Sequence, residues 1–110
     1  MTVIGDVSGA DVILVDDLVD TAGTLCKAAQ AIMDKGANSV RALCTHPVLS
    51  GNAYENIENS VLTELMVCDT IPMRQTSPKI NVLSTAMLFS RAIRNMHEHR
   101  SISALFLEGL

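Results

Sequence analysis

The apolar run DVILVD at residues 11–16 constrains the fold of this 110-residue chain more than any other feature. Aliphatic residues without polar alternation are typical of a strand that is buried on both faces, as in parallel sheets. A helix is predicted next, at residues 24–35, where apolar side chains recur at helical spacing, and Gly36 ends it. A buried strand that leads into an amphipathic helix predicts an α/β fold with a parallel sheet.

The rest of the chain repeats this alternation. It predicts helices at 52–59 and 84–97 and strands at 39–44, 63–68, 80–83 and, at the sheet edge, 101–107. Ser84 is the expected N-cap of the last helix. An apolar stripe on that helix is expected to face the core: Ala86, Phe89, Ile93 and Met96. The order of elements predicts a doubly wound, mostly parallel sheet with right-handed crossovers.

Composition excludes several classes of protein. Hydrophobic residues make up 48% of the chain and charged residues 18%, with a formal net charge of −4. This balance differs from that of a disordered segment, and a nucleic-acid-binding domain would carry an excess of basic residues. No apolar stretch reaches the roughly 18 residues that span a bilayer. We therefore expect neither a nucleic-acid partner nor a membrane.

The cysteines and the charge distribution give two further expectations. Cys26, Cys44 and Cys68 lie in apolar runs without disulfide or metal-site spacing, which predicts free buried thiols and a cytoplasmic location. Residues 1–69 carry ten acidic and three basic side chains, a net charge of −7, whereas residues 70–110 carry two acidic and five basic ones, a net charge of +3. Such asymmetry is typical of a surface that meets a partner, although a chance distribution explains it equally well.

The candidate chemistry is concentrated where the first strand ends. Two adjacent carboxylates, Asp16 and Asp17, are costly there unless they face solvent, a cation or hydroxyl donors. The turn at residues 21–24 opens into a helix whose N-terminal amides bind phosphate readily, and Gly23 allows a close approach. These residues fit a sugar phosphate with Mg²⁺ nearby. The alternative is that Asp17 and Asp20 only solvate the loop and cap the helix.

Residues 12–24, VILVDDLVDTAGT, resemble the phosphoribosyl diphosphate (PRPP) motif of the phosphoribosyltransferase fold. Four flanking segments are similar to those of the ribose-phosphate pyrophosphokinase family, also called PRPP synthetases: IGDVSG at 4–9, THPVLSG at 45–51, DTIP at 69–72 and SISALF at 101–106. The resemblance covers essentially the whole chain and implies a type I phosphoribosyltransferase fold. One departure is Asp69, which stands where the family has Asn.

The resemblance also implies that the chain is one part of a two-domain enzyme. Members of this family have two tandem domains of this fold, and residues 1–110 resemble the C-terminal part of the second domain. The sheet would then be truncated at its N-terminal side. The N-terminal ATP-binding domain and a catalytic loop with Lys and Arg would lie outside the chain. We therefore expect the 110 residues alone to be inactive, with no catalytic residue of their own.

The family's functional residues carry over to the matching positions of this sequence. Asp16 and Asp17 would hold the ribose 2- and 3-hydroxyls and also bind Mg²⁺, the implied cofactor. The 5-phosphate would be wrapped by Asp20, Thr21, Ala22, Gly23 and Thr24. An allosteric nucleotide site between subunits would include Ser101, Ser103 and Phe106.

The implied activity is transfer of diphosphate from ATP to ribose 5-phosphate, which gives PRPP and AMP for nucleotide biosynthesis. The implied partners are therefore ribose 5-phosphate, ATP and PRPP. Further copies of the chain are implied as well, because dimers of this family build hexamers.

Other interpretations stay open. A PRPP-binding regulator or a catalytically silent synthetase-like subunit would use the same loop, as would another phosphoribosyltransferase that joins PRPP to a base. A phosphoacceptor receiver domain also begins with an aliphatic strand that ends in paired acids, and Asp69 and Lys79 could mimic its acceptor and its lysine. His46, which follows a strand, could act as a general base, but a role in ordering the loop is favoured.

Overall fold

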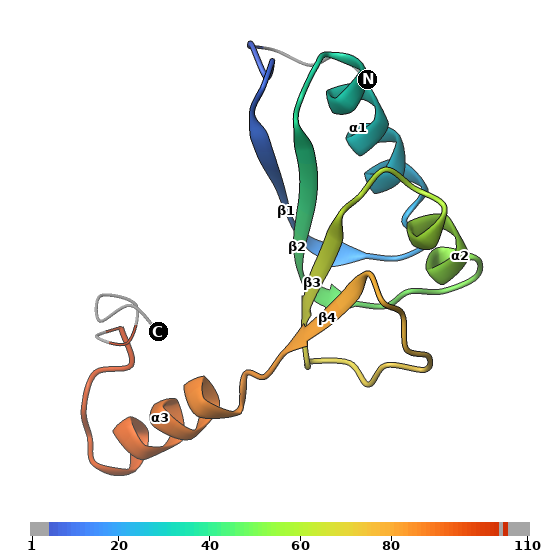
Figure 1. Cartoon of the computed structure of the whole chain (residues 1–110). Helices are drawn as coiled ribbons and strands as arrows, with labels where there is room; N and C mark the ends of the chain where they lie inside the picture. Colours follow the sequence, from blue (N-terminus) through green and yellow to red (C-terminus); the bar gives the residue numbers. More distant parts are fainter. Residues whose placement is uncertain (1–4, 104, 106–110) are drawn as a thin grey trace.

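Four parallel strands form one sheet in the computed structural model, which describes residues 5–103 and residue 105. Their order in the sheet is their order in the chain (Figure 1): β1 (Asp11–Val19), β2 (Ser39–Pro47), β3 (Glu64–Cys68) and β4 (Ile80–Leu83). In the register, Val15 lies opposite Leu43, and Leu43 lies opposite Met66. The mostly parallel α/β sheet that the sequence predicts is confirmed.

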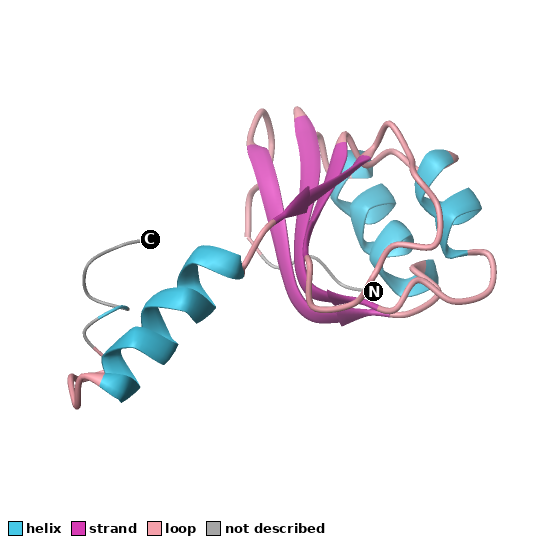
Figure 2. Ribbon diagram, turned by 90° about the horizontal axis from the view of Figure 1, so that it is seen from below, coloured by secondary structure: helices cyan, strands magenta, loops and turns pink. Residues whose placement is uncertain are grey.

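Two helices cover one face of this sheet. α1 (Gly23–Asp34) and α2 (Ala53–Glu58) lie on the same side of the strands (Figure 2). The core lies between these helices and the sheet, and its largest fully buried aliphatic side chains are Val40, Leu49, Ile57, Leu62, Leu65 and Val67. Burial of each such side chain contributes roughly 1.5–3 kcal/mol. This layer fixes the position of the loops at the carboxyl ends of the strands.

The opposite face of the sheet is open among the described residues. Side chains alternate between the two faces along a strand, so Val12 and Leu14 pack against the core. Ile13 and Val15 project from the other face, where 64% and 75% of their surface is exposed. Leu43, the neighbour of Val15 on β2, is exposed on this face too. A helix layer on the second face, which a doubly wound sheet would have, is not seen in this part of the chain.

α3 (Ala86–His97) projects away from the sheet and does not pack on it (Figure 1). The expectation that its apolar stripe faces the core is wrong: Ala86 is exposed, and Phe89, Ile93 and Met96 are each more than half exposed. The spacing of these residues is that of an amphipathic helix, but no described element covers the stripe. None of the described helices is long and apolar enough to cross a membrane.

The described residues after α3, 101–103 and 105, do not form the edge strand that was expected at residues 101–107. The Asn95 side-chain amide donates to the Ser101 carbonyl at 2.8 Å, and the Leu105 N–H donates to the Ile102 carbonyl at 3.0 Å. These local hydrogen bonds use backbone groups that a strand would need for pairing. The remaining residues of this range, 104, 106 and 107, lie outside the described residues.

Candidate functional site

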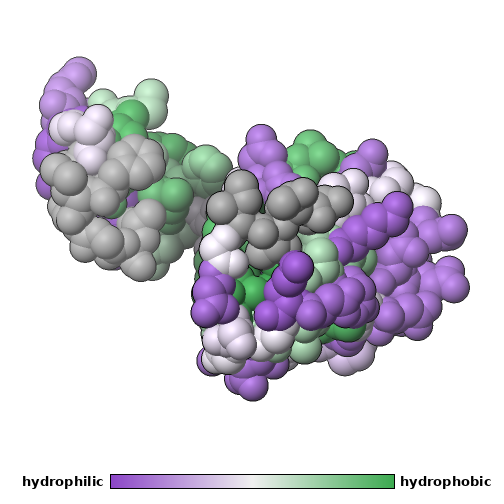
Figure 3. Space-filling view, turned by 90° about the horizontal axis from the view of Figure 1, so that it is seen from above, coloured by the Kyte–Doolittle hydropathy of each residue, from purple (hydrophilic) through white to green (hydrophobic). Residues whose placement is uncertain are grey.

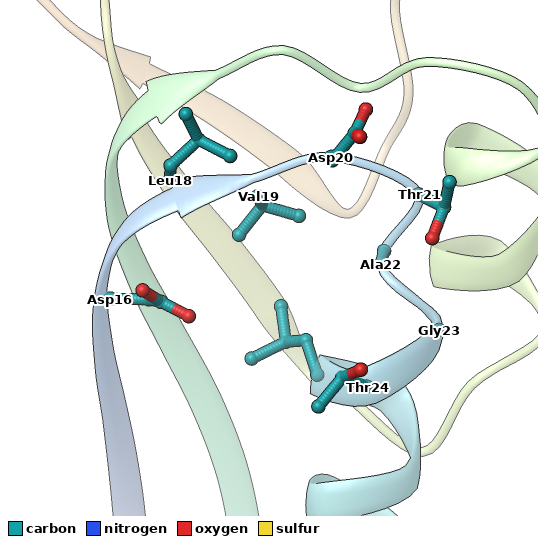
Figure 4. Close-up of a pocket in the computed structure, with 9 residues that line it drawn as sticks. Asp16, Leu18, Val19, Asp20, Thr21, Ala22, Gly23 and Thr24 are labelled. Atoms are coloured by element: carbon teal, nitrogen blue, oxygen red, sulfur yellow. The ribbon is translucent and has the colours of Figure 1, made fainter.

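A pocket of about 190 Å³ lies where β1 turns into α1 (Figure 4). This is the carboxyl end of a parallel strand, which is where α/β folds place their ligands. The pocket is lined by Asp16 and by residues 18–25. It therefore brings together all but one of the predicted substrate-binding residues: Asp16, Asp20, Thr21, Ala22, Gly23 and Thr24.

Asp17 is the residue that the pocket does not include. Adjacent residues of a strand point to opposite faces, and Asp16, not Asp17, lines the pocket. The Asp17 backbone N–H donates to the Asp16 carboxylate at 2.8 Å. Both side chains are exposed. The structure thus does not bring the two predicted carboxylates together in one site.

The backbone at Ala22 shapes the anion-binding end of the pocket. Ala22 is buried in the left-handed conformation, with φ 67° and ψ 5°, which costs a non-glycine residue roughly 1–2 kcal/mol. No side chain caps α1, and the Cys26 N–H donates to the Ala22 carbonyl at 2.9 Å. Residues 23–25 line the pocket, and as the first residues of the helix they have N–H groups without an intrahelical partner. They can bind an anion at the positive end of the helix dipole.

Two residues whose roles the sequence did not reveal hold this loop in place. The Ser50 N–H donates to the Asp20 carbonyl at 3.0 Å, and the Ser50 hydroxyl donates to the Asp20 carboxylate. Asn56 of α2 donates its side-chain amide to the Thr21 carbonyl at 2.9 Å. Asp20 therefore binds the segment between β2 and α2 and does not cap α1. The signal that could have pointed to Ser50 is its place in the THPVLSG segment.

His46 orders the loops next to the pocket. Its Nδ1 lies 2.8 Å from the Thr70 Oγ1, and the Thr70 hydroxyl donates to the Thr45 carbonyl at 3.0 Å. Because the hydroxyl proton is already used, the His46 Nδ1 carries the hydrogen that Thr70 accepts. His46 thus ties β2 to the loop after β3, and this geometry supports the loop-ordering role over that of a general base.

Asp69 and Lys79 do not form the phosphoacceptor pair of a receiver domain. Asp69 accepts hydrogen bonds from the Thr85 hydroxyl and, at 2.9 Å, from the Thr85 N–H. These bonds, that of the hydroxyl first, lower the pKa of Asp69. The Lys79 Nζ donates instead to the Ser60 carbonyl at 2.8 Å. Thr85, not the expected Ser84, is the N-cap of α3, so Asp69 fixes the start of that helix.

The cysteines are free thiols, and burial disfavours two of them as nucleophiles. Cys44 is buried, and Cys26 and Cys68 are partly buried. Burial raises the pKa of the Cys26 and Cys44 thiols, so both stay protonated at neutral pH. No three His, Cys, Asp or Glu side chains converge into a metal cluster in the described part of the chain. A Mg²⁺ ion at the pocket would need oxygens from a substrate as well, which is its usual mode of binding.

Two of the three residues predicted for an allosteric nucleotide site, Ser101 and Ser103, follow α3, which projects away from the sheet and this pocket. Ser101 and Ser103 are exposed beyond the end of α3 that is farther from the sheet (Figure 1). Phe106 lies outside the described residues. Their assignment stays a prediction.

The chain is similar to known proteins over nearly its whole length. Residues 1–107 match the family described as the phosphoribosyl synthetase-associated domain. The chain is 55% identical to a ribose-phosphate pyrophosphokinase of Wolinella succinogenes and 53% identical to one of Campylobacter jejuni. Each alignment covers 97% of this chain and 35% of the relative. The chain thus spans about a third of the length of these relatives.

A solved structure has the same fold. It is a phosphoribosylpyrophosphate synthetase of Mycobacterium smegmatis, which matches with a TM-score of 0.84 at 36% sequence identity. The match covers 87% of this chain and 33% of that chain. It confirms the fold that the sequence led us to expect.

Proposed function

Because the chain belongs to the phosphoribosyl synthetase-associated domain family, we propose that it is the acceptor-binding part of a ribose-phosphate pyrophosphokinase. In such an enzyme, diphosphate passes from ATP to the 1-hydroxyl of ribose 5-phosphate, and the products are PRPP and AMP. The pocket between β1 and α1 would hold ribose 5-phosphate and then PRPP. ATP would bind to other parts of the enzyme, since the chain spans about a third of its relatives.

The observation that carries this proposal is the polarity of the pocket. The uncapped N–H groups of residues 23–25 lie at one end, where an anion is favoured. Figure 4 shows the Asp16 side chain across the pocket from Ala22 and Gly23, where its carboxylate can accept hydrogen bonds from hydroxyl groups. Ribose 5-phosphate has the same polarity, with a phosphate at C5 and neighbouring hydroxyls at C2 and C3. We therefore place the phosphate on residues 21–24 and the sugar toward Asp16.

The lining residues explain how the acceptor is positioned, and a cation must come from elsewhere. Diphosphoryl transfer is catalysed chiefly by alignment and by neutralisation of the developing charge, yet no Lys or Arg lines the pocket. Mg²⁺ fits beside Asp16, because this ion commonly binds through one or two carboxylates together with substrate oxygens. When bound, it would supply charge neutralisation. Asp16 would orient the ribose hydroxyls, and Asp17 stays a predicted ligand that lies outside the pocket.

The wider context of the enzyme is part of the same proposal. We place it in the cytoplasm, because free thiols suit a reducing compartment. We take it to be a homo-oligomer, because the exposed apolar side chains of the sheet and of α3 suit subunit contacts. Ser101, Ser103 and Phe106 would belong to its allosteric nucleotide site, as the segment at 101–106 suggests.

A titration of the isotope-labelled chain with ribose 5-phosphate, followed by NMR, tests the pocket. The Gly23 and Thr24 amides should shift at millimolar ligand, since a few amide contacts must offset the lost freedom of the ligand. Inorganic phosphate should shift the same amides, and ribose without phosphate should not. Gly36, at the other end of α1, serves as an internal control. Unchanged Gly23 and Thr24 amides in a folded sample would refute the site.

Release of AMP separates an enzyme from a PRPP-binding regulator. A longer protein that contains this chain should release AMP from ATP when ribose 5-phosphate is added. The 110-residue chain alone should not, because no cation lines its pocket. If the longer protein binds ribose 5-phosphate but releases no AMP, the regulatory or silent-subunit interpretation is correct and the enzymatic one is wrong.

A further inference from the structure

The backbone at Leu49 has a conformation that its neighbours must hold in place. Leu49 lies shortly after β2, and its φ of 49° is in the left-handed region, which a leucine rarely adopts. Its side chain is only 1% exposed. Its N–H donates to the carbonyl of Val19, the last residue of β1, at 3.1 Å. Leu49 is therefore anchored to the strand that leads into the pocket.

Arg74 binds the carbonyl of Leu49 from the loop between β3 and β4. Its guanidinium donates a hydrogen bond to the Leu49 carbonyl oxygen. Arg74 forms no ion pair with a carboxylate in the part of the chain that the structure describes, so its charge acts on this backbone carbonyl. A hydrogen bond from a charged donor is stronger than one between neutral groups. The contact joins the β3–β4 loop to the segment between β2 and α2.

Two successive peptide groups connect Arg74 to the pocket. In a trans peptide the C=O and the N–H lie on opposite sides of one plane. Arg74 binds the Leu49 C=O, and the N–H of the same peptide group, that of Ser50, donates to the Asp20 carbonyl at 3.0 Å. The Asp20 carbonyl in turn shares its peptide group with the Thr21 N–H. We call this connection, from Arg74 to the Thr21 N–H, the peptide relay.

The Thr21 N–H is available to a bound anion. Thr21 lines the pocket (Figure 4), and its N–H has no acceptor among residues 5–103 and 105. The next peptide group is held as well, because Asn56 donates to the Thr21 carbonyl at 2.9 Å. With both of its peptide groups held, the direction of the Thr21 N–H is fixed. Hydrogen bonds in series also polarise one another, which makes this N–H a stronger donor.

We propose that Arg74 is a positioning residue for phosphate binding, which acts on the Thr21 N–H through the peptide relay. This inference rests on the proposed function, which places the phosphate on residues 21–24. Neither Arg74 nor any other Lys or Arg lines the pocket. Backbone N–H groups must therefore bind the anion, and their direction and polarity determine the affinity. Arg74 supports one of them with a positive charge that stays outside the pocket.

An NMR titration of the 110-residue chain with inorganic phosphate tests this role. Arg74→Ala should increase the Kd for phosphate about 3- to 10-fold, as expected for the net loss of one hydrogen bond. Arg74→Met retains a long side chain without its donors and should weaken binding to the same extent. It also replaces Arg74→Ala in the test if that variant does not fold. Urea unfolding checks that each variant is folded in the conditions of the titration.

The chain without ligand gives a second readout, which a general loss of stability would not produce. In Arg74→Ala the Ser50 amide hydrogen should exchange faster with solvent, because its peptide group has lost a partner. The signal of the Thr21 amide nitrogen should shift for the same reason. The Cys26 N–H, which donates to the Ala22 carbonyl at 2.9 Å outside the peptide relay, should exchange at its wild-type rate.

Two control variants separate the contact of Arg74 from its charge and from its loop. Arg91→Ala removes the same charge from α3, which lies in the projecting lobe of Figure 3. Gln75→Ala changes the residue next to Arg74 in the β3–β4 loop. Both variants should bind phosphate with the wild-type Kd.

The outcomes distinguish this inference from the proposed function. If phosphate does not shift the Gly23 and Thr24 amides of the wild-type chain, the pocket assignment is wrong and the role of Arg74 is refuted with it. If the wild-type chain binds phosphate and either Arg74 variant binds it equally well, only the role of Arg74 is refuted. The same conclusion follows if Arg91→Ala weakens binding as much as Arg74→Ala does. It also follows if the Ser50 amide keeps its wild-type exchange rate in Arg74→Ala.

Discussion

Replacing Gly23 by alanine should separate the stability of the chain from its affinity for phosphate. Gly23 is not among the glycines with positive φ, and an added Cβ would have the Thr21 Oγ1 as its nearest neighbour at 3.7 Å, an ordinary contact. The folded chain therefore has room for the methyl group. Because alanine restricts the unfolded chain, the free energy of unfolding should rise by about 0.4–1 kcal/mol. This corresponds to an increase in Tm of about 2–8 °C.

The same methyl group should weaken binding at the pocket. Gly23 lines the pocket at the start of α1, where we place the phosphate. A carbon at that point keeps a phosphate oxygen away from a backbone N–H, and loss of a hydrogen bond to a charged group costs about 1.5–3 kcal/mol. The Kd for ribose 5-phosphate should therefore increase about 10- to 150-fold. Urea unfolding gives the stability, and the NMR titration gives the affinity.

Gly36→Ala is the matched control for Gly23→Ala. Gly36 has a φ of +94°, and an added Cβ would lie 3.3 Å from the Ser8 Oγ. This variant should lose at least about 1 kcal/mol of stability and keep its affinity for ribose 5-phosphate. The reasoning fails if Gly23→Ala binds ribose 5-phosphate as tightly as the wild-type chain. It also fails if Gly23→Ala is destabilised as much as Gly36→Ala.

Three further predictions concern the loop, the acids and α3. Asn56→Ala should lower the free energy of unfolding by about 0.5–1.5 kcal/mol and weaken phosphate binding, because it removes the hydrogen bond to the Thr21 carbonyl. The control is Asn59→Ala, at the exposed end of α2, which should change the free energy of unfolding by less than about 0.5 kcal/mol in urea. Asp16→Asn should remove the preference for ribose 5-phosphate over inorganic phosphate in the NMR titration, whereas Asp17→Asn should retain it, and the opposite result would contradict the pocket assignment. Because the pKa of Asp69 is lowered in the folded chain, its contribution to stability is present above the ordinary value of 3.8 and is lost as the pH falls through the lower folded-state pKa. The NMR signals of the amides in the first turn of α3 should therefore shift in that acidic range. A shift near neutral pH would show that another group holds the helix.

The elements with a local sequence signal were predictable, and their ends were less so. The strand Ile80–Leu83 was predicted with its observed bounds. β1 and β2 continue three residues past their predicted ends, to Val19 and Pro47, because the parallel pairing between them continues. The acids at 16–17 suggested a strand end, but β1 is an edge strand of the described sheet and tolerates exposed carboxylates. The stripe of α3 was predictable as an apolar pattern, but a pattern does not specify the surface that covers it.

Some residues of the candidate site could likewise be predicted from the sequence, and others could not. Asp16 and residues 20–24 could be found from the sequence, because a strand, a turn and a helix start are consecutive in the chain. The left-handed conformation of Ala22 could not, because glycine is the residue normally expected there. Ser50 and Asn56 could not be assigned either, since they contact the loop from about 30 residues away and depend on how α2 packs.

The order of the four strands has a consequence for how the protein folds during synthesis. Each strand of the described sheet pairs with the strand made just before it. No strand has to wait for a segment made after its neighbour, so the loop-closure entropy for each step stays small. A nascent chain emerging from the ribosome can therefore join β2 to β1 around α1, then add β3 and β4 in turn. In chains stalled after β3, the pairing of β1 with β2 should be complete. The Leu65 amide should still exchange its hydrogen faster than in full-length chains, because its partner, the Lys79 carbonyl, has yet to be made.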